Sequence, residues 1–186
     1  MLAVITTRPA FRAAVLGAYL LLVTYARVVA SQISPAVVPA LIVGGLALAA
    51  AAWGWPAGRL GLGTSRLAVR VIGGLGLAVV LLIPTAARTG AMAALPLDLA
   101  AAAVLVSIGE ELAFRGALFA ALEDVGGAPV AVIGTTAVWT AAHALSHPPE
   151  FLVPVAAAGL LLGVWRMACR DLVAPVIAHV IADLAL

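Results

Sequence analysis

The chain carries little charge and no lysine. Only 10% of its 186 residues are charged, and all ten of its Lys and Arg residues are arginine. Soluble domains contain about 25% charged residues, so this composition excludes an ordinary soluble protein. The arginines form no dense basic run, so we expect no nucleic-acid partner. Cys169 is the only cysteine, which excludes an intrachain disulfide.

Hydrophobic residues, in contrast, make up 65% of the chain, and the mean hydropathy is +1.22. A helix that crosses a bilayer needs about 20 largely apolar residues. The sequence therefore predicts an all-α protein, a polytopic transmembrane bundle of about seven helices. The predicted spans are 11–30, 36–53, 67–86, 97–121, 128–147, 151–168 and 172–186, of which the last is short.

These spans occupy most of the chain and leave no room for a soluble domain. The first span follows two arginines, as the apolar part of a signal sequence does. No small-residue cleavage site stands out after it. We therefore expect the segment 11–30 to be retained as the first membrane helix.

The arginines also predict an orientation. An N-terminus in the cytoplasm puts seven arginines at the inner side and only Arg88 in an outer loop, in agreement with the positive-inside rule. Arg27 lies late in the first span, and we expect its side chain to extend toward the outer surface. The alanine-rich, lysine-free composition is typical of a GC-rich bacterial genome, so we expect a bacterial cytoplasmic membrane protein surrounded by lipid. The seven arginines are Arg8, Arg12, Arg59, Arg66, Arg70, Arg166 and Arg170.

A few ionisable side chains remain inside the predicted spans, all in the second half of the chain. A charge at bilayer depth costs at least about 2.5–3.5 kcal/mol, and ionisable residues at that depth are candidates for function. They fall on three different predicted helices. The group consists of Glu110, Glu111, Arg115, His143, His179 and Asp183.

Helical spacing separates the two adjacent glutamates. Glu111 and Arg115 are four residues apart, so they share a helix face and can form an ion pair. Glu110 is rotated by about 100° from Glu111. We expect Glu111 to have a structural role and Glu110 to present a free carboxylate to a cavity, where it can accept and return protons.

The histidines show the same one-turn spacing. His143 follows Trp139 by four residues, and Asp183 follows His179 by four. An aspartate one turn from a histidine commonly orients the imidazole. His147 precedes two prolines, so we expect it at a helix end near water.

Taken together, Glu-Glu-x-x-x-Arg, an aromatic-x-x-x-His and His-x-x-x-Asp occur in this order, each on its own predicted helix. This pattern resembles the CPBP family of CAAX proteases and bacteriocin-processing enzymes, also called the Abi family. The resemblance covers residues 97–186 and implies a catalytic core in the last four helices. Residues 1–96 are then a variable N-terminal part with three spans. Trp139 stands where the family commonly has Phe, and Asp183 where its eukaryotic branch has Asn.

The resemblance implies an intramembrane endopeptidase that acts on a membrane-associated protein or peptide. Glu110, assisted by His143, would activate a water for attack on the scissile carbonyl. His179, positioned by Asp183, would stabilise the oxyanion. Glu111, held by Arg115, would support the helix. Whether the substrate carries a lipid stays open.

The same ionisable residues also allow other functions. The metal-free reaction needs no cofactor, but Glu110, His143 and His179 would also make a ligand set suited to zinc. The His-Glu-x-x-His signature of many zinc proteases is absent. Buried Glu, His and Asp on facing helices can also pass protons in a proton-coupled transporter, but the sequence lacks the inverted repeats with broken helices that would indicate one. A non-catalytic protein of the bacteriocin-immunity kind is a further alternative.

Overall fold

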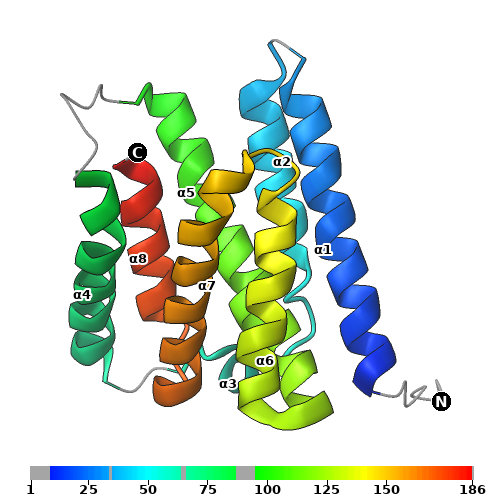
Figure 1. The fold of residues 1–186 in the computed structure, drawn as a ribbon, viewed down its shortest axis with the longest axis vertical. Helices are drawn as coiled ribbons and strands as arrows, with labels where there is room; N and C mark the ends of the chain where they lie inside the picture. Colours follow the sequence, from blue (N-terminus) through cyan, green and yellow to red (C-terminus); the bar gives the residue numbers. More distant parts are fainter. Residues whose placement is uncertain (1–8, 34, 64–65, 87–94, 186) are drawn as a thin grey trace.

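All regular secondary structure is helical in the computed structural model, which describes residues 9–33, 35–63, 66–86 and 95–185 (Figure 1). The predicted all-α class is thereby confirmed. Arg8 and Arg88, used above to predict orientation, lie outside the described residues. The helices are α1 (Pro9–Ser31), α2 (Val37–Ala50), α3 (Ala57–Leu60), α4 (Leu67–Ala86), α5 (Leu97–Glu111), η1 (Leu112–Leu118), α6 (Phe119–His143), α7 (Pro149–Cys169) and α8 (Val173–Leu184).

The helices form a bundle in which α5 occupies the centre. It packs against α2 on one side and against α8 on the other. Figure 1 shows α4 and α8 at one edge of the bundle, and α1 and α2 toward the opposite edge. Helix α6 packs against both α1 and α7. The helix that ends in the two glutamates is therefore surrounded by elements from both halves of the chain.

The fourth and fifth predicted spans differ from the observed helices. The chain continues from α5 through the π-helix η1 into α6 and kinks only at Gly126 and Gly127. Gly127 has φ +79°, a conformation that glycine adopts readily. Helix α6 then ends at His143 and not at residue 147. The extended Pro148 that follows disfavours helical geometry just before it, so the helix ends a turn earlier.

The π-helix η1 was not predicted. It begins directly after Glu111 and carries Arg115. A π-helical turn inserts an extra residue into the helix and is frequent at functional sites. The apolar pattern of the segment continues through it, so the sequence contains no sign of the change.

Two of the described helices, α1 and α7, are long and apolar enough to cross a membrane by length and composition. Helices α2 and α8 and the segment Leu67–Ile83 of α4 are apolar but shorter. The structure thus contains two candidate spans and three shorter apolar helices, where the sequence predicted seven spans.

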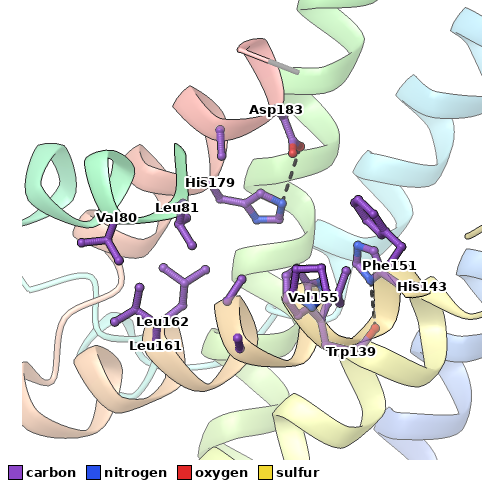
Figure 2. Close-up of a pocket in the computed structure, with 14 residues that line it drawn as sticks. Val80, Leu81, Trp139, His143, Phe151, Val155, Leu161, Leu162, His179 and Asp183 are labelled. Atoms are coloured by element: carbon purple, nitrogen blue, oxygen red, sulfur yellow. Dashed lines mark hydrogen bonds and ion pairs between the residues drawn. The ribbon is translucent and has the colours of Figure 1, made fainter. Parts of the chain in front are cut away.

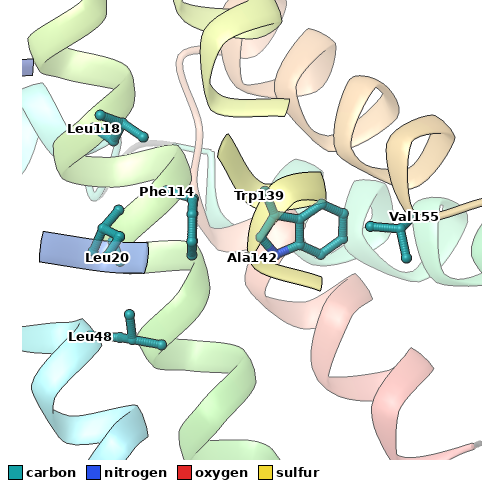
Figure 3. Close-up of a cluster of buried hydrophobic side chains, with 8 residues drawn as sticks. Leu20, Leu48, Phe114, Leu118, Trp139, Ala142 and Val155 are labelled. Carbon is teal, nitrogen blue, oxygen red and sulfur yellow. The ribbon is translucent and has the colours of Figure 1, made fainter. Parts of the chain in front are cut away.

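A buried hydrophobic cluster joins the N-terminal helices to the second half of the chain (Figure 3). Leu20 of α1 and Leu48 of α2 pack with Phe114 of η1, and none of these side chains is exposed. Trp139 of α6 and Val155 of α7 complete the same cluster. The helices expected to be variable therefore pack directly against the segment that carries the candidate site.

Candidate active site

Glu111 lies at the centre of a buried charge cluster. Arg115 Nη1 donates to Glu111 Oε1 at 2.8 Å, and neither side chain is exposed to solvent. The ion pair predicted from their spacing is confirmed. His179 Nδ1 donates to the same oxygen at 2.9 Å. Glu111 thus connects η1 with α8, a contact between helices that the spacing within one helix could not reveal.

Glu110 does not carry the free carboxylate that was expected. Arg27 Nη2 donates to Glu110 Oε1 at 2.9 Å, and Trp139 Nε1 donates to Oε2 at 3.0 Å. The prediction that Arg27 extends to the outer surface was also wrong, since its side chain is only 12% exposed. A buried carboxylate is costly unless it is paired and hydrogen-bonded, and both partners come from other helices.

Trp139 connects most of the candidate residues. Its indole N–H binds Glu110, and its backbone carbonyl accepts a hydrogen bond from His143 Nδ1 at 2.9 Å. The Arg115 guanidinium lies 4.0 Å from the centre of the indole ring, a cation–π contact. The rings of His143 and His179 meet the indole edge-on, with centroids 4.5 and 5.7 Å away. One tryptophan therefore brings these side chains together.

The contact with Trp139 fixes the tautomer of His143. A carbonyl oxygen can only accept, so the hydrogen of a neutral imidazole resides on Nδ1. The other nitrogen, Nε2, is then free to accept a proton. His143 is half-buried at the last residue of α6 and lines a cavity (Figure 2). This is the state that a general base requires.

Asp183 faces His179 from the next turn of α8. The distance from His179 Nε2 to Asp183 Oδ2 is 3.5 Å, longer than the contact with Glu111 (Figure 2). Asp183 Oδ2 also lies 2.7 Å from the hydroxyl of Ser107 on α5. The structure therefore brings His179 and Asp183 together as the spacing predicted, and it adds Ser107 as a link to the central helix.

A cavity of about 530 Å³ opens beside these residues, between α4, α6, α7 and α8 (Figure 2). His143, His179 and Asp183 form its polar part. Glu110 is not among the residues that line it. The remaining wall is almost entirely apolar and comprises Val80, Leu81, Trp139, Phe151, Pro154, Val155, Ala157, Ala158, Leu161, Leu162 and Ala182.

The residues do not fit the zinc alternative. Among the residues that the structure describes, no three His, Cys, Asp or Glu side chains are grouped to hold one metal ion. Glu110 does not line the cavity that His143 and His179 share, and His143 Nδ1 is engaged by a carbonyl. His179 faces a carboxylate with each nitrogen. We therefore assign no step of the chemistry to a metal.

Two contributors to the site escaped the sequence reasoning, Arg27 and Ser107. Arg27 lies within an apolar span. Ionisable residues inside such spans are candidates for function, and this applies to Arg27 as it does to the two glutamates. Its position near the end of the span suggested an interfacial residue instead. Ser107 shares a helix face with Glu110, but nothing in the sequence indicated which helix that face would meet.

The model of the Rce1-like family, described as type II CAAX prenyl endopeptidases, matches residues 92–185, just over half of the chain. Comparisons with curated proteins and with solved structures found no match. The matched segment contains all six residues predicted from the motifs, while Arg27 lies outside it. The family consists of integral membrane proteases and agrees with the resemblance drawn from those motifs. The chain therefore belongs to the Rce1-like family of type II CAAX prenyl endopeptidases.

Proposed function

We propose that this protein is an intramembrane endopeptidase that hydrolyses a peptide bond in a membrane-associated protein or peptide. The observation that carries the proposal is the apolar cavity with His143, His179 and Asp183 in its wall. Such a cavity suits a substrate that has an apolar segment or lipid chain next to the bond to be cut. Membership of a protease family supports the same reaction.

In the proposed reaction, a water molecule attacks the scissile carbonyl carbon. Glu110, assisted by His143, takes a proton from that water as the C–O bond forms. His143 is the member of this pair that lines the cavity, and its Nε2 is the free acceptor. The proton then passes to the leaving nitrogen as the C–N bond breaks, which yields a new carboxyl group and a free amine.

The carbonyl oxygen becomes negatively charged during the attack and needs a donor. We assign this role to Nε2 of His179, which lines the cavity: Nδ1 is bound by Glu111 at 2.9 Å, whereas Asp183 lies 3.5 Å from Nε2 and leaves its N–H able to donate to the oxyanion. These two carboxylates hold the ring in place and favour its donating form. Glu111 is in turn neutralised by Arg115. The supporting pair therefore acts on the reaction through His179.

We further propose that the helices form a polytopic bundle of about seven spans in a bacterial cytoplasmic membrane, with the N-terminus in the cytoplasm. The outer faces of the helices support this placement because they expose many large apolar side chains. Apolar side chains that are exposed together on one face indicate a surface that contacts lipid. On α4 the exposed apolar side chains include Leu67, Val69, Ile72, Leu75, Val79, Val80 and Ile83.

The proposed activity can be tested with a quenched fluorescent peptide that ends in a farnesylated CAAX sequence. We expect the purified protein to cleave it in detergent or liposomes, and Glu110→Gln to abolish cleavage because the neutral amide cannot accept the proton. Glu150→Gln is the matched control, since Glu150 is exposed in the first turn of α7. The same peptide without the farnesyl group tests whether the lipid is needed.

Cleavage by the Glu110→Gln protein at the wild-type rate would overturn the assignment of the base. A wild-type protein that cleaves neither peptide would contradict the proposed activity on CAAX-type substrates. Efficient cleavage of the unmodified peptide would agree with the proposed endopeptidase activity. It would also mean that the apolar cavity binds apolar side chains of the substrate and not a prenyl chain.

A further inference from the structure

Arg27 is a partly buried cation in the helix most distant in sequence from the family motifs. It lies on α1, which precedes the segment matched by the family model. Its side chain is 12% exposed and ends on Glu110 Oε1, 83 residues away in the sequence. A charged side chain that is largely enclosed within an apolar helical bundle is costly unless it is paired, and Glu110 is that partner.

Helix α2 leaves room for this side chain. A Cβ atom at Gly44 would lie 2.6 Å from Arg27 Cδ, 2.8 Å from Cγ and 3.0 Å from Cβ. These distances are shorter than any ordinary contact, so the stem of Arg27 lies against a surface that only glycine provides. Gly44 is itself buried. Helices α1 and α2 therefore pack closely around the Arg27 side chain, whose guanidinium group reaches Glu110.

Each of the two adjacent glutamates thus has its own arginine. Glu111 is neutralised by Arg115 from the following turn, and Glu110 by Arg27 from α1. The side chain of Glu110 is 5% exposed, so water alone cannot compensate its charge. The indole of Trp139 satisfies the other oxygen but brings no charge.

We propose that Arg27 is a positioning residue for the reaction, which keeps the Glu110 carboxylate charged and oriented. This inference rests on the proposed function, because it assigns to Arg27 an action through the proposed base. Each carboxylate oxygen can accept two hydrogen bonds. With one taken by Arg27 and one by Trp139, Glu110 retains the capacity to accept from a water. The catalytic unit then includes α1 and α2 as well as the matched core.

The first test compares Arg27→Ala and Arg27→Lys with the wild-type protein on the farnesylated peptide. We expect Arg27→Ala to lower kcat by about 100-fold with little change in KM, because displacement of a catalytic group affects the transition state and not the binding of substrate. Arg27→Lys restores the charge without the planar geometry and should recover part of that loss. Arg12→Ala is the matched control, since Arg12 lies at the other end of the same helix and contacts only Trp55 among the interactions described.

The second test needs no activity. Gly44→Ala should lower the melting temperature of the wild-type protein, because the added methyl group collides with the stem of Arg27. In the Arg27→Ala background the same substitution should cost little, since the space is then vacant. Gly17→Ala is the control, because a Cβ atom at Gly17 would meet nothing within 4 Å.

The outcomes separate this inference from the proposed function. If the wild-type protein cleaves the peptide and Arg27→Ala matches it in kcat, the positioning role is wrong and the protease assignment stands. If Gly44→Ala is equally harmful with and without Arg27, the packing on which the inference rests is refuted. Loss of activity in Arg27→Ala with partial recovery in Arg27→Lys, together with the Arg27-dependent effect of Gly44→Ala, supports it.

Discussion

At the scale of single residues, the buried cluster of Glu111, Arg115 and His179 is stable only while its opposite charges compensate one another. Breaking one partner of a buried ion pair typically costs about 3–5 kcal/mol, because the other charge is left without compensation. Arg115 has no exposed surface through which water could reach it. Glu111 is therefore important for stability even where its role in the reaction is indirect.

We accordingly expect Glu111→Gln to lower the melting temperature markedly. Replacing the pair together, as Glu111→Gln with Arg115→Met, should recover part of the stability because no lone charge remains. Thermal unfolding in detergent checks this, with Glu150→Gln as the exposed control. A Glu111→Gln protein as stable as that control would show that the cluster contributes nothing to the fold.

The three histidines offer a second comparison at this scale. We expect His143→Ala to abolish cleavage of the farnesylated peptide, and His179→Ala to lower turnover by about 100–1000-fold, as loss of an oxyanion donor does. His147→Ala should retain most of the activity, since His147 is exposed and is not among the residues that line the cavity, although its ring stacks on the lining residue Phe151. Full activity of His143→Ala would remove it from the mechanism.

The sequence predicted those residues that share a helix turn and missed those that meet across helices. The spacing of Glu111 with Arg115 and of His179 with Asp183 was sufficient to predict their proximity. The contact of Glu110 with Arg27 depends on how α1 packs against α2, α6 and η1, and no pattern within one helix encodes that packing. The catalytic roles of these residues remain predictions.

At the scale of helices, the close approach of α2 to α5 determines where Glu110 lies. A Cβ atom at Gly109 would lie 2.2 Å from the Gly45 carbonyl oxygen, and one at Gly45 would lie 2.9 Å from the carbonyl oxygen of Leu105. The two backbones are thus in direct contact, as small residues permit in membrane bundles. Gly109 immediately precedes Glu110, so any displacement there is transmitted to the carboxylate.

We therefore expect Gly109→Ala to destabilise the protein by about 1–3 kcal/mol, the usual cost of forcing an extra methyl group into a packed contact, and to reduce cleavage. Thermal unfolding and peptide turnover measure the two effects. Gly76→Ala on α4 is the control, because a Cβ atom there would meet nothing within 4 Å. Equal stability of the two variants would mean that α2 and α5 are farther apart than the structure shows.

Helix content was predictable from apolar runs, whereas helix ends were not. The runs located α1, α4 and α7 within a few residues, because each is bounded by polar or turn residues. The π-helix η1 and the early end of α6 depend on local hydrogen bonding that an apolar pattern does not specify. His143 consequently lies at a helix end beside the cavity and not one turn inside a span.

At the scale of the whole molecule, the described arginines other than Arg27 and Arg115 gather at one end of the bundle. Arg166 Nη2 donates to the Arg59 carbonyl at 2.7 Å, and Arg12 stacks on Trp55, which Arg59 also approaches. Arg70 pairs with an aspartate just after α7. The start of α1, α3 and the end of α7 all lie at this end in Figure 1, whereas the turn after α6 lies at the other.

The positive-inside rule then predicts that this arginine-rich end faces the cytoplasm. Cys169, the exposed last residue of α7, provides a native thiol there. A second protein with Cys169→Ser and Ser146→Cys carries its single thiol after α6, at an exposed position on the opposite end. Labelling these two proteins with the same thiol reagent therefore reports which end of the bundle lies on each side of the membrane.

With a membrane-impermeant maleimide on intact spheroplasts, we expect labelling of the Ser146→Cys protein and protection of Cys169 until the membrane is permeabilised. Both thiols should react equally after solubilisation in detergent, which controls for local accessibility. The reverse pattern would place the arginine-rich end outside and overturn the predicted orientation. Because His143 ends α6 only three residues before Ser146, the same labelling also establishes from which side of the membrane water can most directly reach the proposed catalytic histidine.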